Sequence, residues 1–369
     1  MSTAGDVLDQ LTSPGELYEA LPDQAVRCTA CAHRCLLREN RRGICRVRFN
    51  RQGKIMVPWG YVAGLQADPV EKKPFYHFLP GAIALTFGML GCDFHCTYCQ
   101  NWVSSQTLRD PMSDQSAFYI HRINPKQVVD TAESLKAEVI VSSYNEPLIT
   151  TEWAVAIFRI AKERGFRTGY VSNGNATEEA LKYLRPHLDA YKVDLKSMQD
   201  KNYRLLGGVL KNVQNTIRQA WDSGLWVEVV TLVVPGFNDS NEELWQAARF
   251  LAGISPNIPW HVSAFHRDYK MLDAENTPAR TLLRAAEIGR EAGLHHVYAG
   301  NLPGRVEEYE DTLCAHCNTA LVTRRGYQIL SYMITASGNC PKCGKSVAGL
   351  WTNDPKRVNL DGPGMPGMV

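Results

Sequence analysis

The stretch GCDFHCTYCQNW, residues 91–102, places Cys92, Cys96 and Cys99 in the order C-x3-C-x2-C. Three thiolates so close together can hold three of the four irons of a 4Fe-4S cluster, whereas a closed zinc site or an all-cysteine cluster needs four ligands. The motif therefore predicts a cluster with one iron left open to a small molecule. The alternative interpretation is a zinc site without its fourth ligand, or a few buried thiols.

Strand and helix patterns alternate along the chain around this motif. Asn124 and Pro125 predict one helix N-terminus, and Ser240 with Glu243 predicts a capping box at another. Such β-α units predict a parallel sheet, and six of them that close partway form a partial (β/α)6 barrel resembling a TIM barrel. A doubly wound sheet is less favoured because no G-x-G-x-x-G follows the first strand. The runs that predict strands are residues 83–89, 138–143, 168–172, 190–195, 226–234 and 260–265, with a weaker one at 295–299.

Five of these predicted strands end in polar motifs, and the first runs directly into the cysteine loop. In a barrel the carboxyl ends of the strands form one face, and that face carries the chemistry. Each motif alone has an ordinary structural explanation, such as a turn or an exposed ion pair. Five in succession predict a site. The motifs are SYNEP (143–147), SNG (172–174), DLK (194–196), VPGFND (234–239) and AFH (264–266).

With these motifs, residues 83–266 resemble the activating-enzyme branch of the radical S-adenosylmethionine (SAM) superfamily, which includes pyruvate formate-lyase activating enzyme. The whole chain resembles the radical enzymes of the AmmeMemoRadiSam system, on its four amino-terminal cysteines, EKKPFYHFLPG (71–81), SYNEP and VPGFND. The resemblance implies that Cys92, Cys96 and Cys99 hold a 4Fe-4S cluster and that SAM chelates the open iron. A low-potential electron donor would then drive cleavage of SAM to a 5′-deoxyadenosyl radical, which abstracts a substrate hydrogen atom.

The resemblance also implies a set of cofactor contacts. Tyr144 to Pro147 would replace the family's Gly-Gly-Glu-Pro segment, whose backbone receives the methionine amino group. Tyr144 and Asn145 replace the two glycines, which puts that backbone approach in question. Tyr98 and His266 would lie near the adenine. The cofactor-binding residues implied are Tyr98, Asn145, Glu146, Asn173, Asp194, Lys196 and His266.

Two further cysteine groups flank this region. Four soft ligands near the amino terminus predict a closed site for zinc or for a second iron-sulfur cluster, and the sequence does not choose between them. Reduced cysteines in a basic loop are the alternative. Two C-x2-C pairs near the carboxyl terminus predict a zinc ribbon, although rubredoxin-like iron uses the same ligands. The groups are Cys28, Cys31, Cys35 and Cys45, and then Cys314, Cys317, Cys340 and Cys343.

Four regions are predicted. They are a four-cysteine segment (1–58), a partial barrel (59–310), a zinc-ribbon-like module (311–352) and a Gly- and Pro-rich tail (353–369) that we expect to be disordered. The segment 71–78, charged and aromatic, is expected either to cover the mouth of the barrel or to be a plain connecting loop. An open barrel flanked by such segments favours a protein or peptide substrate.

Composition narrows the possible partners and the compartment. Lys plus Arg is 40 and Asp plus Glu is 38, so a net charge of +2 predicts neither nucleic-acid nor anionic-membrane binding. No apolar run reaches about 18 residues and no signal peptide is evident, so we expect a cytoplasmic protein. Grouped cysteines agree with metal ligation in a reducing compartment. The other AmmeMemoRadiSam proteins are the implied partners.

Two other functions compete with this one. A glycyl-radical-enzyme activase would use the same cluster, but many such activases carry paired ferredoxin-type cysteines after the core motif, and these are absent here. A non-catalytic iron-sulfur or zinc module for electron transfer or binding would explain the outer cysteines. It gives no reason for a three-cysteine motif on the first strand of a barrel.

Overall fold

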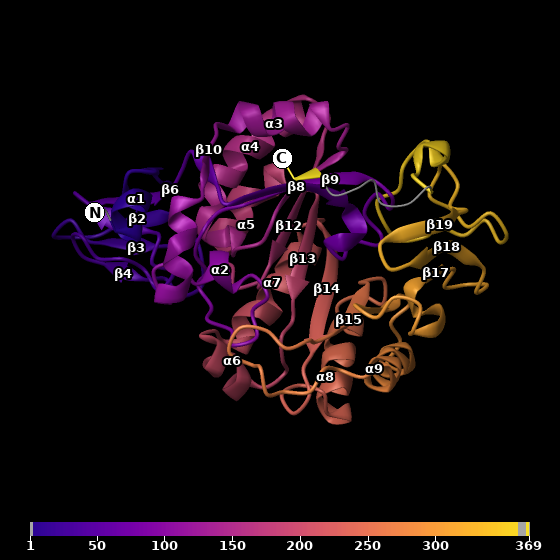
Figure 1. Ribbon diagram of the computed structural model, residues 1–369. Coiled ribbons are helices and arrows are strands. Elements are labelled where there is room, and N and C mark those ends of the chain that lie inside the picture. Colours follow the sequence, from indigo (N-terminus) through magenta and orange to yellow (C-terminus); the bar gives the residue numbers. More distant parts are fainter. Residues whose placement is uncertain (1–2, 361–366, 369) are drawn as a thin grey trace.

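The computed structural model describes residues 3–360, 367 and 368. A central sheet lies between the amino-terminal segment, drawn in indigo, and a small carboxyl-terminal module, drawn in yellow (Figure 1). The sheet has nine strands in the spatial order β16-β15-β14-β13-β12-β11-β9-β8-β20. Seven of them, β9 and β11 to β16, are parallel; at the edge, β8 pairs antiparallel with β9 and β20 pairs antiparallel with β8. These strands are β8 (Gly64–Pro69), β9 (Ile83–Gly88), β11 (Val139–Ser142), β12 (Arg167–Ser172), β13 (Ala190–Asp194), β14 (Trp226–Val233), β15 (Trp260–Ala264), β16 (Val297–Gly300) and β20 (Gly367–Met368).

The parallel strands follow one another in space in the same order as in the chain, and the weak run at 295–299 forms the seventh of them, β16. Because β-α-β crossovers are right-handed, a sheet wound in one direction carries its helices on one face. A doubly wound sheet would reverse its order at a switch point. Within the described residues β16 and β20 do not pair, so the sheet remains open.

Helices cover one face of the sheet. Asn124 caps α3 through the amide of Gln127, and Ser240 caps α8 through the amide of Glu243, as predicted. The reciprocal half of the second box is absent, because Glu243 accepts hydrogen bonds from Ser197 Oγ and the Met198 amide instead. The helices are α1 (Ala4–Asp9), α2 (Trp102–Ser105), α3 (Pro125–Ser134), α4 (Thr151–Glu163), α5 (Glu178–Leu184), α6 (Asp200–Leu206), α7 (Leu210–Asp222), α8 (Asn241–Ala252) and α9 (Ala279–Glu291), with 3-10 turns η1 (Val70–Lys72), η2 (Pro111–Phe118), η3 (Pro147–Thr150), η4 (Arg185–His187), η5 (Glu307–Glu310) and η6 (Pro355–Arg357).

The other face of the sheet is filled, toward the amino ends of its strands, by residues 71–78. Ala84 and Val139, near the starts of β9 and β11, pack there against Phe75 and Phe78, which are fully buried. The expectation that this segment covers the mouth of the barrel is wrong. Aromatic side chains gain more from burial under the sheet than from covering its open end, since each removes a large apolar surface from water.

Smaller sheets build both ends of the molecule. The carboxyl-terminal module docks on the buried segment: Arg324 donates to the Tyr76 carbonyl at 3.0 Å, and Leu350 N donates to the His77 carbonyl at 2.8 Å. Residues 361–366 and 369 of the tail lie outside the described part, whereas Gly367 and Met368 pair with β8. The remaining strands are β1 (Thr12–Pro14), β2 (Tyr18–Ala20), β3 (Val26–Cys28), β4 (Leu36–Leu37), β5 (Phe49–Arg51), β6 (Lys54–Pro58), β7 (Tyr61–Val62), β10 (His121–Arg122), β17 (Thr312–Leu313), β18 (Ala320–Arg325) and β19 (Gln328–Tyr332).

Candidate functional site

The cysteine loop leaves the carboxyl end of β9. Cys96 is buried, and Cys92 and Cys99 are half-buried. The Phe94 amide donates to Cys92 Sγ at 3.3 Å, and the Ser105 hydroxyl lies 3.3 Å from Cys99 Sγ. Burial raises the pKa of all three thiols, that of Cys96 to about 12. The loop therefore presents thiols that need bound metal to become thiolates at neutral pH.

A cluster of charged side chains from the end of β13, in which Lys192 is buried and Asp194 and Lys196 are half-buried, lies beside this loop. Lys196 Nζ is 3.2 Å from Asp194 Oδ2, and Lys192 pairs with the other carboxylate oxygen. Burial alone would lower the pKa of Lys196, but the charges of Asp194 and Cys96 raise it well above its usual value. Burial likewise opposes ionisation of Asp194, whose pKa the two lysines nevertheless lower to about 2. Lys196 is thus a fixed cation next to the thiols of Cys96 and Cys99.

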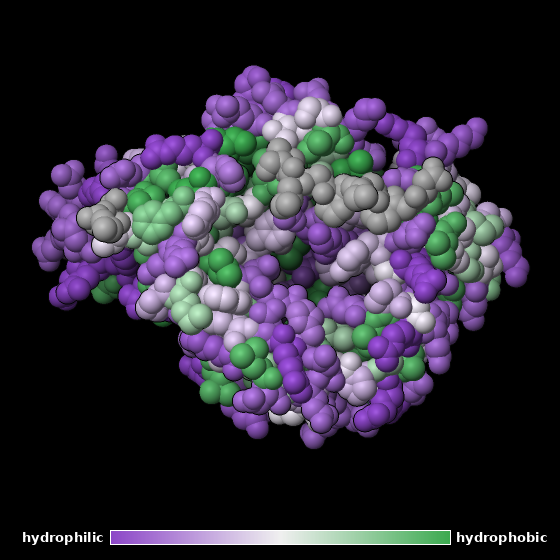
Figure 2. All heavy atoms as spheres, viewed as in Figure 1, coloured by the Kyte–Doolittle hydropathy of each residue, from purple (hydrophilic) through white to green (hydrophobic). Residues whose placement is uncertain are grey.

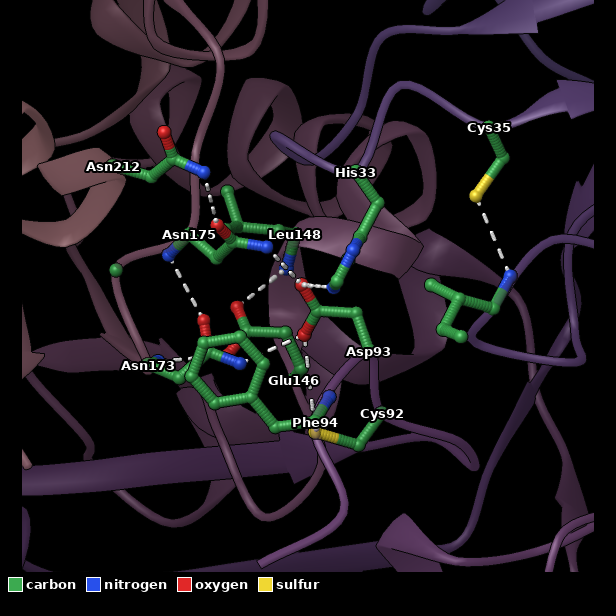
Figure 3. A network of polar contacts seen from close by, with 12 residues as sticks. His33, Cys35, Cys92, Asp93, Phe94, Glu146, Leu148, Asn173, Asn175 and Asn212 are labelled. Carbon is green, nitrogen blue, oxygen red and sulfur yellow. Dashed lines mark hydrogen bonds and ion pairs between the residues drawn. The ribbon is translucent and has the colours of Figure 1, made fainter. Parts of the chain in front are cut away.

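A polar network under the loop joins β9, β11 and β12 (Figure 3). Asp93 accepts from Asn173 Nδ2 at 2.7 Å and from Asn175 Nδ2 at 2.9 Å. Glu146 accepts from Ser172 Oγ and from the Asn173 amide, both at 2.7 Å. Burial, and then the neighbouring charge of Asp93, raise the pKa of Glu146 to about 8. The network fixes the ends of three strands around Cys92.

The side chains of Tyr144 and Asn145 in the SYNEP segment form hydrogen bonds with other residues of the protein. Asn145 Oδ1 accepts from the Met89 amide at 3.0 Å, which ties the segment to the end of β9. Tyr144 has a φ of 69°, the left-handed region that glycine usually occupies. Its hydroxyl lies 3.0 Å from Lys73 Nζ and 3.2 Å from Gln66 Oε1, on the β8 side. The side chain that replaces glycine therefore points to β8, and the backbone keeps the glycine-like turn.

Of the two residues expected near an adenine, Tyr98 belongs to the cysteine loop and His266 contacts it. Tyr98 is buried, with its ring 5.9 Å from that of Phe237 in the VPGFND motif. His266 is exposed, and its Nε2 lies 2.8 Å from Gln100 Nε2. The space-filling view shows a hollow near the middle of the face that it draws (Figure 2).

Comparison with known proteins decides the family. Residues 87–251 match the model of the radical SAM superfamily. The chain is 34% identical to protein MJ0808 of Methanocaldococcus jannaschii. The match covers 89% of this chain and 97% of that protein. The chain belongs to the radical SAM superfamily. Members of this superfamily are enzymes that use a 4Fe-4S cluster and SAM.

Other radical SAM relatives are more distant. Pyruvate formate-lyase-activating enzyme of Staphylococcus aureus is 25% identical over 48% of this chain and 72% of that protein. A crystal structure of a radical SAM methyltransferase from Sphaerobacter thermophilus aligns with a TM-score of 0.45 and 16% identity, over 66% of this chain and 71% of that one. Within the described residues, none of the helices combines the length and the apolar character that crossing a bilayer demands.

The carboxyl-terminal cysteines of this radical SAM chain form a compact set. Cys314 and Cys343 have sulfurs 3.7 Å apart, as do Cys317 and Cys340, and all four sulfurs lie within 4.8 Å of one another. A tetrahedral zinc with Zn–S bonds of about 2.3 Å separates its sulfurs by about 3.8 Å. The residues therefore fit one zinc ion, as the ribbon spacing predicted.

The polar partners around the cysteine loop are residues that the motifs did not indicate. Asp93 lies inside the cysteine motif but was not predicted as a site residue, and Asn175 lies one residue beyond SNG. Gln100 follows Cys99 directly. Their partners are 80, 82 and 166 positions away. The position of Asp93 next to Cys92 was the one sequence signal for this network, and only the fold shows which residues Asp93 contacts.

Proposed function

We propose that Cys92, Cys96 and Cys99 bind three irons of a 4Fe-4S cluster and that SAM binds the fourth. When bound and reduced, this group supplies a 5′-deoxyadenosyl radical that removes a hydrogen atom from the substrate. The observation that carries the proposal is the position of the three thiols: they follow β9 at the strand edge where Glu146, Asn173 and Lys196 also gather.

The protein's own residues would orient and shield the group. Lys196 favours thiolates at Cys96 and Cys99 by its charge and, with Asp194 and His266, lines the approach of the SAM carboxylate, ribose and adenine. Asn145, Glu146 and Asn173 hold the segment whose backbone would receive the methionine amino group. Tyr98, buried beside Phe237, excludes water from the loop.

The remaining features of the proposed function concern substrate and partners. We assign the chain to the AmmeMemoRadiSam branch, with a low-potential electron donor and a protein or peptide substrate. We take residues 59–310 to form a partial barrel. The open edges of its sheet and the hollow in Figure 2 support a large substrate. Residues 71–78 no longer do so, because they are buried. The flanking regions 1–58 and 311–352 would be separate metal-stabilised units, followed by the tail 353–369.

The test is formation of 5′-deoxyadenosine by anaerobically reconstituted protein under a strong reductant. Cys96→Ala should abolish it, while Cys343→Ala, an exposed thiol of the carboxyl-terminal set, serves as the matched cysteine control. Turnover that survives Cys96→Ala would refute the assignment. Full cleavage combined with a new glycyl radical on a partner enzyme would favour the activase, and no cleavage by well-loaded protein would favour a non-catalytic module.

A further inference from the structure

The four amino-terminal cysteines converge at one place in the fold. Cys28 N donates to the Cys35 carbonyl at 3.0 Å. Cys28, Cys31 and Cys45 are buried there, and Cys35 is half-buried. A Cβ built on Gly43 would lie 3.6 Å from the sulfurs of both Cys35 and Cys45. The thiols thus surround a small space that a side chain at Gly43 would enter.

The spacing of these thiols differs from that of the zinc-sized set. Among residues 3–360, 367 and 368, only the carboxyl-terminal cysteines form a group of three or more ligands whose atoms all lie within 4.8 Å of one another. The four amino-terminal thiols are spread more widely, and so are those of Cys92, Cys96 and Cys99. The irons of a cluster stand between its cysteine ligands and hold the sulfurs further apart than one zinc ion does.

Backbone amides also point at these sulfurs. Ile44 N donates to Cys35 Sγ at 3.4 Å, and the amides of Val47 and Arg48 reach Cys45. Hydrogen bonds to sulfur are among the features that set the reduction potential of an iron-sulfur cluster.

The amino-terminal thiols lie directly against the cysteine loop of the radical site. A Cβ on Gly91, the residue before Cys92, would come within 3.2 Å of the Cys45 carbonyl oxygen. Arg109 Nη2 donates both to the Ile44 carbonyl at 2.7 Å and to the Cys92 carbonyl at 3.0 Å. One guanidinium therefore holds the two ligand loops together.

Asp93 lies between Cys92 and His33 of the amino-terminal segment (Figure 3). One carboxylate oxygen is 3.9 Å from Cys92 Sγ and the other is 3.9 Å from Nε2 of His33, which lies between Cys31 and Cys35 in the chain. Asp93 thus links the loop of Cys92 to the segment that carries Cys31 and Cys35 through His33.

The outer side of the amino-terminal site is basic and partly apolar. Arg38, Arg41 and Arg46 are exposed around it. Leu36 and Ile44, each next to a ligand cysteine, are 54% and 42% exposed. A basic surface with exposed apolar residues suits a small acidic protein that must associate quickly and leave again.

We propose that Cys28, Cys31, Cys35 and Cys45 bind a second iron-sulfur cluster and that this cluster is where electrons enter the enzyme from an acidic ferredoxin. Reduced ferredoxin loses one electron, the second cluster gains it and passes it to the cluster at Cys92, Cys96 and Cys99, and no proton moves. The electron-entry step rests on the proposed function, whereas the identity of the bound metal does not.

The metal test uses the full chain with Cys92, Cys96 and Cys99 all changed to Ala, reconstituted anaerobically. We expect about four irons and one zinc per chain, with a reducible iron-sulfur electron paramagnetic resonance signal. Cys35→Ala in that background, at the most accessible of the four thiols, should remove the signal while circular dichroism stays unchanged. Two zincs and no iron, or no metal beyond the carboxyl-terminal zinc, would overturn the proposal.

Electron entry is tested by the ratio of ferredoxin-driven to dithionite-driven 5′-deoxyadenosine formation. Arg38→Glu/Arg41→Glu should lower this ratio by about tenfold at low salt. Arg280→Glu/Lys356→Glu, which changes the net charge equally at exposed positions of α9 and η6, should not. An unchanged ratio in the first variant would refute docking at this surface. If the iron persists but no variant cleaves SAM, the metal assignment holds and the proposed function fails.

Discussion

Asn173 Nδ2 donates to Asp93 Oδ1 at 2.7 Å, across 80 positions of the chain, and both side chains are buried. The bond attaches the cysteine loop after β9 to the end of β12. It satisfies one oxygen of the Asp93 carboxylate. Within the described part of the chain, no lysine or arginine forms an ion pair of 4 Å or less with this carboxylate. The carboxylate in the cysteine loop is therefore held by the amide side chains of Asn173 and Asn175, while Arg109 binds the backbone carbonyls of Cys92 and Phe94 in the same loop.

Asn173→Ala should destabilise the protein by about 1–3 kcal/mol, because a buried carboxylate oxygen loses its donor. The same change should lower iron incorporation at the three-cysteine loop. Urea unfolding and iron content after reconstitution measure the two effects. Asn212→Ala is the matched control, since Asn212 reaches the network only through a 3.4 Å bond to Asn175. Equal losses in the two variants would contradict the role given to Asn173.

Lys196→Met should reduce cluster loading or SAM cleavage by about 10–100-fold, since it removes a half-buried cation beside Cys96 and Cys99. Asp194 keeps Lys192 as a partner, which limits the damage to the fold. Lys196→Arg should restore part of the loading because it restores the charge. Absorbance of the cluster and the melting temperature separate these effects. Wild-type loading in Lys196→Met would show that the charge is unimportant.

Arg48→Met should cost about 3–5 kcal/mol of stability, because it leaves the Glu152 carboxylate buried without its partner. Arg48 binds Glu152 through two hydrogen bonds of 2.7 and 2.8 Å, and both side chains are almost completely buried. The pair attaches the amino-terminal segment to α4. Arg48→Met/Glu152→Gln should recover much of the loss in chemical denaturation. Lys182→Met, which breaks an exposed pair with Glu178, should leave the unfolding midpoint unchanged.

Cys340→Ser should release zinc and loosen residues 311–352, because small modules of this kind depend on their metal for folding. Hydrogen exchange should also rise at residues 75–78, since His77 Nδ1 lies 2.6 Å from the Ala348 carbonyl of the module. SAM cleavage should persist, as the thiols of the radical site lie at the opposite ends of the strands. Loss of cleavage with an intact fold would assign this site an electronic role.

Glu71 gives stability a defined pH dependence. Burial raises its pKa from 4.5 to about 7. The pKa of Glu71 is higher in the folded protein than in the unfolded chain. The contribution of protonated Glu71 to the free energy of unfolding is therefore fully present below pH about 4.5 and is lost as the pH rises through about 7. Glu71→Gln keeps an acceptor for the Gly81 amide and should abolish that slope, worth up to about 3 kcal/mol. The free energy of unfolding is measured by urea titration from pH 5 to 8. If it changes with pH equally in wild type and variant, the assignment to Glu71 is disproved.

The sequence alone determined the order of the parallel strands, the caps at Asn124 and Ser240, and the three cysteine groups. These features depend on neighbours within a few residues, such as apolar periodicity and ligand spacing, so they can be read locally. The polar strand endings were also visible, and parallel strands necessarily bring their carboxyl ends to one edge.

Only the tertiary structure decided what those residues contact. It paired Asp93 with Asn173, turned Tyr144 toward β8, and buried residues 71–78, which the sequence placed at the mouth or in a loop. It also brought the four carboxyl-terminal thiols into one compact set, although 22 residues separate their two C-x2-C pairs in the sequence. Distances through space and the burial of charge arise from packing between distant segments, and no local pattern of residues specifies them.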